Sequence, residues 1–170
     1  IFVSGTLGDS AAGLDILLNK NGKTSSEPDR YLCQRHLRPT PRVELGLALR
    51  PFSYCAIDIS DGLLADLGHI LERSQVGAEI YLDQLPLSRH LRENYSEAEA
   101  ENFALTGGED YELCFTVSDE KRESMQQLLR SQGILVTCIG RILPATSGLI
   151  LQKNGKIIST PTQSGFDHFH

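Results

Sequence analysis

One stretch near the middle of the chain limits the possible folds more than any other. Residues 54–59 form a short, largely apolar run of strand length, and residues 62–74 carry apolar side chains at helical spacing. The apolar positions of the second run are Leu63, Leu64, Leu67, Ile70 and Leu71. A strand therefore turns into an amphipathic helix at Ser60 and Asp61. Such a unit requires a sheet with a helix packed against it.

The rest of the chain shows the same mixture of patterns. Helical spacing predicts helices at 11–18, 30–36, 43–49, 88–94, 97–105 and 119–131. Strand-like runs stand at 1–3, 78–82, 111–117 and 134–142. Asn154 and Gly155 separate two further short runs and give the strongest hairpin signal in the sequence. The elements together predict a mixed α/β or α+β domain with helices covering a sheet.

Length and composition favour one folded domain over residues 1–170. The chain is 40% hydrophobic and 22% charged, which is enough apolar material for one sizeable core. The chain begins at Ile1, inside an apolar strand run, and this start predicts that the sequence was cut from a longer protein.

Charge and hydropathy argue against two classes of partner. A net charge of −6 disfavours nucleic acid and anionic membranes, because neither attracts an acidic surface. No run approaches the roughly 18 apolar residues of a membrane span, and no basic-then-apolar leader opens the chain.

The cysteines are Cys33, Cys55, Cys114 and Cys138, whose spacing indicates reduced thiols rather than a zinc site. We therefore expect a cytoplasmic protein.

The turn at residues 58–62 carries the clearest chemical signal. A carboxylate at Asp58 inside an apolar strand is expected to need compensation, because an unpaired buried charge costs on the order of several kcal/mol. Asp58, Ser60 and Asp61 would converge where the strand ends, and hard oxygen ligands of this kind suit magnesium. The free amides of the following helix favour phosphate. The alternative is structural: Ser60 or Asp61 caps the helix, and Asp58 pairs with a distant arginine.

Two further segments allow a functional and a structural interpretation. Residues 106–113 place two glycines before acids at the entrance to a strand, which permits close approach to a ligand but also suits a helix-ending loop with solvated acids. Residues 35–42 form the only dense basic cluster. Its arginines could bind phosphate, or they could pair with acids of the same domain.

With these residues in hand, the chain resembles the C-terminal domain of the bacterial thiamine-monophosphate kinases. These belong to the superfamily of aminoimidazole ribonucleotide synthetase and selenophosphate synthetase. The resemblance is carried by residues 4–13, 35–39, 58–62 and 107–113. It implies an α+β fold of the aminoimidazole ribonucleotide synthetase C-terminal type, with a mixed sheet covered by helices in α/β/α layers that are partly ferredoxin-like.

The resemblance also implies roles for individual residues. Asp58 and Asp61 would bind Mg²⁺, and Ser60 would contact the co-substrate ATP. Glu109 would contact thiamine monophosphate, and Phe166 would supply an aromatic ring beside it, where the family is expected to carry Tyr or Trp as readily.

The resemblance further implies an incomplete enzyme. An N-terminal domain would supply more metal-binding acids, much of the nucleotide site and a homodimer interface, so this chain alone is expected to be inactive. Two alternatives stay open at this point. The chain could belong to an ATP-dependent synthetase of the same superfamily, or it could be a non-catalytic binding domain.

Overall fold

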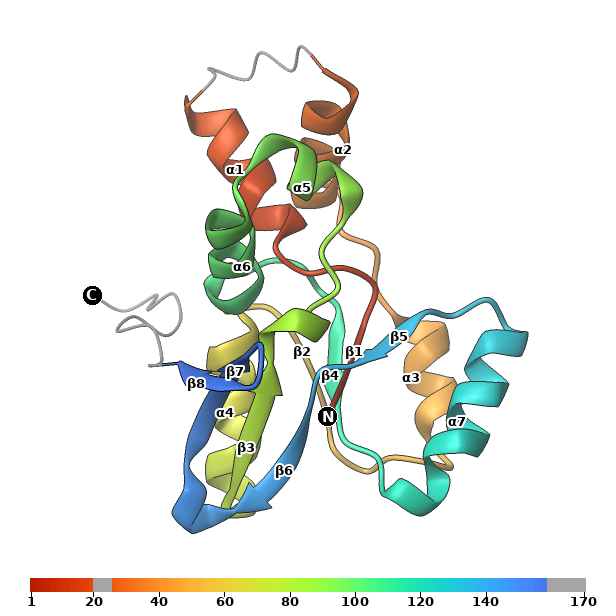
Figure 1. Ribbon diagram of the computed structural model, residues 1–170. Coiled ribbons are helices and arrows are strands. Elements are labelled where there is room, and N and C mark those ends of the chain that lie inside the picture. Colours follow the sequence, from red (N-terminus) through yellow and green to blue (C-terminus); the bar gives the residue numbers. More distant parts are fainter. Residues whose placement is uncertain (20–25, 159–170) are drawn as a thin grey trace.

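The computed structural model describes residues 1–19 and 26–158, whose strands form two four-stranded sheets (Figure 1). The strands are β1 (Phe2–Ser4), β2 (Ala56–Asp58), β3 (Val76–Tyr81), β4 (Leu113–Phe115), β5 (Val136–Cys138), β6 (Gly140–Pro144), β7 (Leu149–Lys153) and β8 (Lys156–Ile158). The helices are α1 (Asp9–Asn19), α2 (Glu27–Leu37), α3 (Val43–Leu49), α4 (Leu63–Ser74), α5 (Arg89–Asn94), α6 (Glu97–Thr106) and α7 (Asp119–Ser131), with two 3-10 turns, η1 (Leu82–Gln84) and η2 (Ala145–Ser147).

The two sheets differ in strand direction. The first has the order β2-β4-β1-β5 and is antiparallel throughout. The second has the order β6-β3-β7-β8 and is mixed, because β3 and β7 run parallel. Ile139 links the sheets: its N–H donates to the Ile1 carbonyl at 2.9 Å, and its carbonyl accepts from the Tyr81 N–H at 2.7 Å. The predicted α+β class with helix-covered sheet is confirmed, and the run at 134–142 divides into β5 and β6 at this link.

The helices form three groups around these sheets (Figure 1). Helix α4 covers one face of the second sheet, α3 and α7 lie beside the first, and α1, α2, α5 and α6 gather at the end opposite the turn between β6 and β7. Each group encloses its own apolar cluster, and the largest cluster joins α4 to strands of both sheets. The strand-to-helix turn at residues 58–62 lies where the sheets meet the group that contains α1 and α6.

Local capping explains where two helices begin. Helix α2 starts three residues earlier than the sequence pattern predicts, because the Ser26 hydroxyl accepts from the Asp29 N–H at 3.1 Å and Pro28 stands in the first turn. Helix α6 begins with a reciprocal capping box between Ser96 and Glu99.

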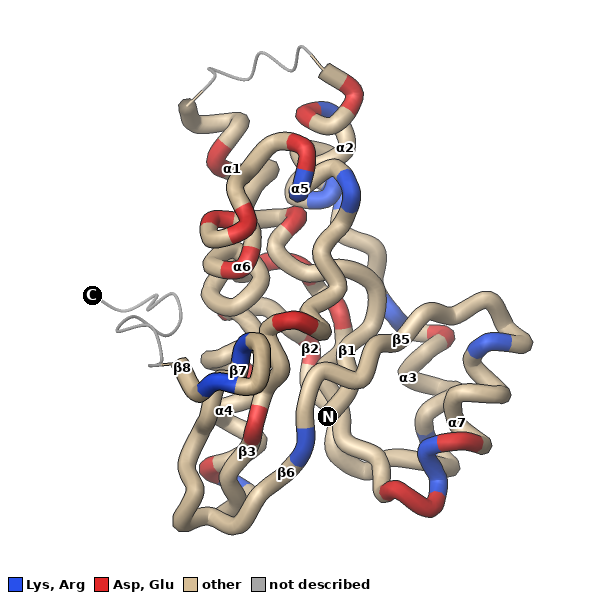
Figure 2. Tube along the Cα trace, viewed as in Figure 1, with Lys and Arg blue, Asp and Glu red and all other residues tan. Residues whose placement is uncertain are grey.

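Positively and negatively charged residues are interspersed along the part of the chain that the structure describes (Figure 2). Figure 2 shows Lys and Arg positions scattered among Asp and Glu positions along the described chain. That nucleic acid is not a partner stays a prediction from the net charge. None of the helices within the described residues has the length and apolar character that a membrane crossing demands.

Helix α4 offers a direct test of the largest core. Leu67 is fully buried in it, whereas His69 on the same helix is exposed. We predict that Leu67→Ala lowers the free energy of unfolding by about 2–5 kcal/mol, because it leaves a cavity. His69→Ala should change it by less than about 0.5 kcal/mol. Urea unfolding followed by circular dichroism measures both, and equal effects would contradict this view of the core.

Candidate functional site

The turn between β2 and α4 is held in place by its own helix. The carboxylate of Asp66 accepts the backbone N–H of Ser60 at 2.9 Å and that of Asp61 at 3.0 Å. Gly62 adopts a φ of 113°, and a Cβ at this position would lie 2.8 Å from the Thr106 carbonyl oxygen. The N-cap position of α4 is Gly62, so neither Ser60 nor Asp61 occupies it.

The glycine-acid segment lies directly against this turn. The N–H of Glu109 donates to the Ser60 carbonyl, and the N–H of Tyr111 donates to the Ile59 carbonyl, both at 2.9 Å. In return, the Ile59 N–H donates to the Glu112 carbonyl at 2.8 Å. Two motifs that lie about fifty positions apart in the sequence thus form one structural unit.

The backbone of this unit is strained. Glu109 and Tyr111 have φ values of 68° and 51°, in a region that side chains other than glycine rarely adopt. Each such residue costs on the order of 1–3 kcal/mol, and this kind of strain is concentrated at functional sites. A Cβ on Gly108 would lie 2.5 Å from the Ser60 carbonyl oxygen, so this glycine permits the close approach.

A cavity of about 470 Å³ opens beside the unit. Ser60 and Glu109 both line it. The structure thus brings together the residue for which the resemblance implies contact with ATP and the one for which it implies contact with the substrate. The remaining walls come from α1, the end of α2 and α6, through Ala11, Leu14, Asp15, Leu18, His36, Phe103, Thr106, Gly107 and Gly108. His36 is fixed there, because its Nδ1 lies 3.0 Å from the Ser10 hydroxyl. The cavity lining therefore combines apolar side chains, an aromatic ring and carboxylates.

Asp58 is placed differently from the sequence argument. It is exposed on the edge strand β2, so the expected cost of a buried charge does not arise. It lines a second cavity of about 450 Å³ with Arg42 and Tyr111. Glu109 and burial raise the pKa of Tyr111, and Asp58 and Asp61 add to the effect. All three carboxylates thus act on this phenol, whose oxygen lies 3.5 Å from the Glu109 carboxylate.

Asp58 and Asp61 are the metal ligands that the resemblance implies. Residues 1–19 and 26–158 contain no group of three or more His, Cys, Asp or Glu side chains placed to bind a metal ion. Asp58 and Asp61 offer two hard oxygen donors, and Mg²⁺ is commonly bound by one or two carboxylates together with water and substrate phosphates. Their chemistry is therefore that of magnesium ligands, and they supply at most two of the oxygen donors that such a site uses.

Two buried carboxylates fix the start of α1, just before Ala11, which lines the cavity. Asp110 accepts the N–H of Gly8 at 2.6 Å and that of Ser10 at 3.1 Å. Asp9 accepts the hydroxyls of Thr6 and Ser88, each at 2.5 Å. Burial raises the pKa of Asp110 to about 7, with a further contribution from Asp9, although the two amides and Arg35 oppose the shift.

The basic cluster pairs with acids of the same domain. Glu112 is fully buried and receives Arg35 Nη2 at 3.0 Å, Arg42 Nε at 2.7 Å and the Ser4 hydroxyl at 2.5 Å. Arg35 Nε also lies 3.7 Å from Asp9. The structural interpretation of these two arginines is therefore correct, whereas Arg38 of the same cluster is exposed.

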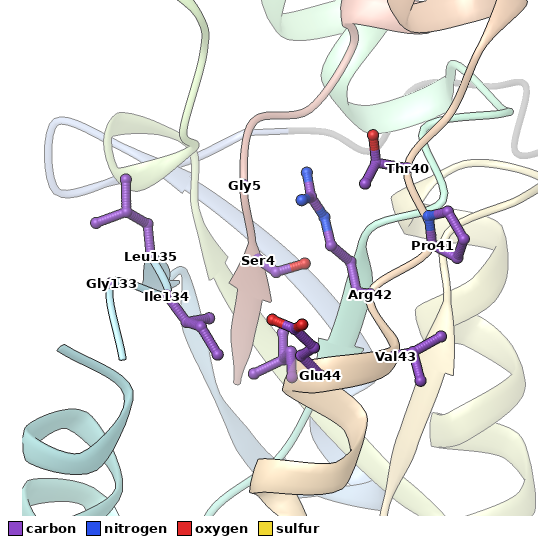
Figure 3. A pocket seen from close by; sticks show the side chains of 11 residues that line it. Ser4, Gly5, Thr40, Pro41, Arg42, Val43, Glu44, Gly133, Ile134 and Leu135 are labelled. Carbon is purple, nitrogen blue, oxygen red and sulfur yellow. The ribbon is translucent and has the colours of Figure 1, made fainter. Parts of the chain in front are cut away.

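A third cavity of about 590 Å³ lies beside Arg42 (Figure 3). Its walls come from the end of β1, the segment that leads into α3, and the turn before β5. Ser4 and Arg42 contribute polar atoms, while Val43, Ile134 and Leu135 contribute apolar surface. Val43 and Leu135 are 64% and 78% exposed, so this area carries uncovered apolar side chains.

Some site residues were missed by sequence reasoning, and one lies outside the structure. Asp66 had a readable signal, because it stands on the buried face of α4 between Leu63 and Ile70, where a charge is out of place. The inward roles of Asp110 and Glu112 had no comparable signal, since their partners come from distant segments. Phe166 lies outside the described residues.

Comparison with known proteins agrees with the resemblance that the sequence motifs indicate. Residues 3–151 match the family model described as AIR synthase related protein, C-terminal domain. A thiamine-monophosphate kinase of Haemophilus influenzae is 51% identical over 172 residues, which cover 99% of this chain and 52% of that protein.

Solved structures agree with this result. The thiamine-monophosphate kinase of Stenotrophomonas maltophilia K279a is 44% identical with a TM-score of 0.81, covering 92% of this chain and 50% of that one. A structure described as AaThiL complexed with AMPPCP and TMP is 38% identical with a TM-score of 0.79, covering 99% and 50% respectively. The chain spans about half the length of the relatives that it matches.

The ion pairs of Glu112 generate a stability prediction. Glu112→Gln keeps the side-chain shape but leaves Arg35 and Arg42 without their shared anion. Removing one partner of a buried pair costs about 3–5 kcal/mol, and we expect a loss of this size in urea unfolding. The exposed Glu120, changed to Gln on α7, is the matched control and should cost less than about 0.5 kcal/mol. A loss below 1 kcal/mol for Glu112→Gln would contradict the assigned role.

Asp110 generates a pH prediction. The folded protein keeps the Asp110 proton up to about pH 7, whereas an ordinary aspartate loses it near 3.8. Because the folded state binds more protons between these values, the free energy of unfolding should fall as pH rises through this window and level off above it. Asp110→Asn cannot titrate, so its decline between pH 4 and 7 should be shallower in urea titrations. Identical slopes for the two proteins would refute the assignment.

Proposed function

The chain belongs to the AIR synthase related proteins, as a C-terminal domain of that family, and on this premise we propose that it is the C-terminal half of a thiamine-monophosphate kinase. The complete enzyme would use ATP to convert thiamine monophosphate into thiamine diphosphate. The kinases of H. influenzae and S. maltophilia, at 51% and 44% identity, support this choice over a synthetase of the same superfamily.

One observation carries the proposal. Ser60 and Glu109 line the same cavity, and a 2.9 Å hydrogen bond between their backbones fixes their separation. In our proposal Ser60 contacts ATP and Glu109 contacts thiamine monophosphate, whose thiazolium ring is cationic and is attracted by a carboxylate. The apolar residues of α1 and the Phe103 ring offer a surface for the organic part of the substrate. Phe166 is proposed as a second aromatic contact.

The reaction asks for positioning more than for acid-base chemistry. The γ-phosphoryl group of ATP would be transferred to a phosphate oxygen of thiamine monophosphate, with ADP as the leaving group. That oxygen is already anionic, so no strong general base is required. Asp58 and Asp61 would bind Mg²⁺, which when present neutralises charge on the phosphates. The chain's own contribution is to hold Ser60, Asp61 and Glu109 at fixed separations.

We further propose that an N-terminal half completes the site and that this chain alone is inactive. The area around α3 is the proposed contact surface. Val43 and Leu47 are 64% and 61% exposed there, and Val43 lines both the cavity of about 590 Å³ and that of about 450 Å³. Asp58 lines the smaller of these cavities, so a domain docked on α3 would lie over the proposed magnesium ligand.

A homodimer and a cytoplasmic location belong to the same proposal, and free thiols at all four cysteines support that location.

Glu109 separates the substrate side of the site from the nucleotide side. In the complete protein, Glu109→Ala should raise the KM for thiamine monophosphate about tenfold or more, because it removes a charge-assisted contact. The KM for ATP should change less than about twofold. Steady-state kinetics with each substrate varied in turn measures both values, with Glu120→Ala as the exposed control. An equal rise in both KM values would place Glu109 elsewhere in the mechanism.

A further inference from the structure

Asp66, a buried carboxylate on α4, has no role in the function proposed so far. Asp66 is only 2% exposed and stands in the first turns of the helix among Leu63, Leu67 and Ile70, which fill the main core. A charge at such a position is costly unless it is hydrogen-bonded. The partners of Asp66 therefore explain why an acid stands there.

The contacts of Asp66 converge on the proposed site. One oxygen, Oδ2, accepts both the Ser60 N–H at 2.9 Å and the Asp61 N–H at 3.0 Å. These residues are the proposed ATP contact and one proposed magnesium ligand. Asp66 thus binds the backbone of both residues, whose side chains would contact ATP and Mg²⁺ in the proposed site.

The same turn is held from its other side. The Ser60 carbonyl accepts the Glu109 N–H at 2.9 Å, while the Ser60 N–H points to Asp66. The positive φ of Gly62 turns the chain into α4, so that the helix can present Asp66 to the residues that precede it. With hydrogen bonds on both faces, the peptide groups on either side of Ser60 have one orientation.

We propose that Asp66 is a positioning residue for the nucleotide and metal side of the site. It sets the directions in which the Ser60 hydroxyl and the Asp61 carboxylate leave the backbone. This inference rests on the proposed kinase function and deepens it. Glu109 governs the response to thiamine monophosphate, whereas Asp66 governs the response to ATP and Mg²⁺.

Two variants of the complete protein test this role by kinetics. Asp66→Ala removes the acceptor, and kcat/KM for ATP should fall about 10- to 100-fold, as is typical when the support of a ligand shell is lost. The Mg²⁺ concentration for half-maximal rate should rise, while the KM for thiamine monophosphate stays within about threefold. Asp66→Asn keeps an oxygen that can accept both amides, so its loss should be clearly smaller.

Glu79→Gln supplies the matched control. Glu79 is a buried carboxylate on β3 that accepts from Tyr81 and Arg141, on the second sheet. It should leave the ATP and Mg²⁺ dependence unchanged even where stability falls. The proposal is overturned if Asp66→Ala retains the wild-type ATP dependence, if Glu79→Gln shifts it equally, or if Asp66→Asn is as impaired as Asp66→Ala.

Amide hydrogen exchange in the same proteins tests positioning without any reference to activity. Exchange in peptides that contain Ser60 and Asp61 should accelerate at least about tenfold in Asp66→Ala, and less in Asp66→Asn. Unchanged exchange would overturn the positioning role. A complete wild-type protein without kinase activity would instead refute the proposed function, and the exchange comparison would still decide the role of Asp66.

Discussion

The buried contact of Glu112 with Arg35 and Arg42 is the interaction on which the rest of this structure depends. It joins β4 to α2 and to the segment before α3, and the Ser4 hydroxyl adds the end of β1. The backbone carbonyl of the same residue accepts the Ile59 N–H, so the turn that carries Ser60 is attached to this point as well. Desolvating these charges is costly, and only multiple partners make a buried anion tolerable. This ion network therefore holds together the segments that carry the candidate site.

The segment 107–112 combines structural and functional tasks through the direction of its side chains. Asp110 and Glu112 point inward and hold the start of α1 and the arginines, while Glu109 is exposed toward the cavity. The positive φ values at residues 109 and 111 allow this division within four positions. The strain is offset by the buried hydrogen bonds. The two preceding glycines have another cause, because a Cβ at Gly107 would clash with the Phe103 carbonyl oxygen and one at Gly108 would lie 2.5 Å from that of Ser60. The phosphate chemistry proposed for the complete protein needs this kind of fixed geometry more than it needs a reactive base.

Sequence patterns predicted much of the fold and the main parts of the candidate site, but not how distant segments meet. Periodicity placed the helices within a few residues and located the turn at Ser60 and Asp61. It did not show that the strands divide over two sheets, because pairing depends on contacts between distant residues such as Val3 and Cys114. The burial expected for Asp58 was wrong, since β2 is an edge strand. For residues 35–42, the choice between phosphate binding and internal pairing needed the position of Glu112. Asp66 was overlooked although its place on an apolar helix face was visible.

The central claim is that this chain carries half of a kinase site. A calorimetric titration of the chain with Mg²⁺ and a non-hydrolysable ATP analogue, then with thiamine monophosphate, tests it most directly when a coupled assay for ADP release is run beside it with ATP. The account predicts weak binding without ADP release by the chain, and turnover once the N-terminal half is present. Robust formation of thiamine diphosphate by the chain alone would contradict the claim, and so would a complete protein that binds neither ligand.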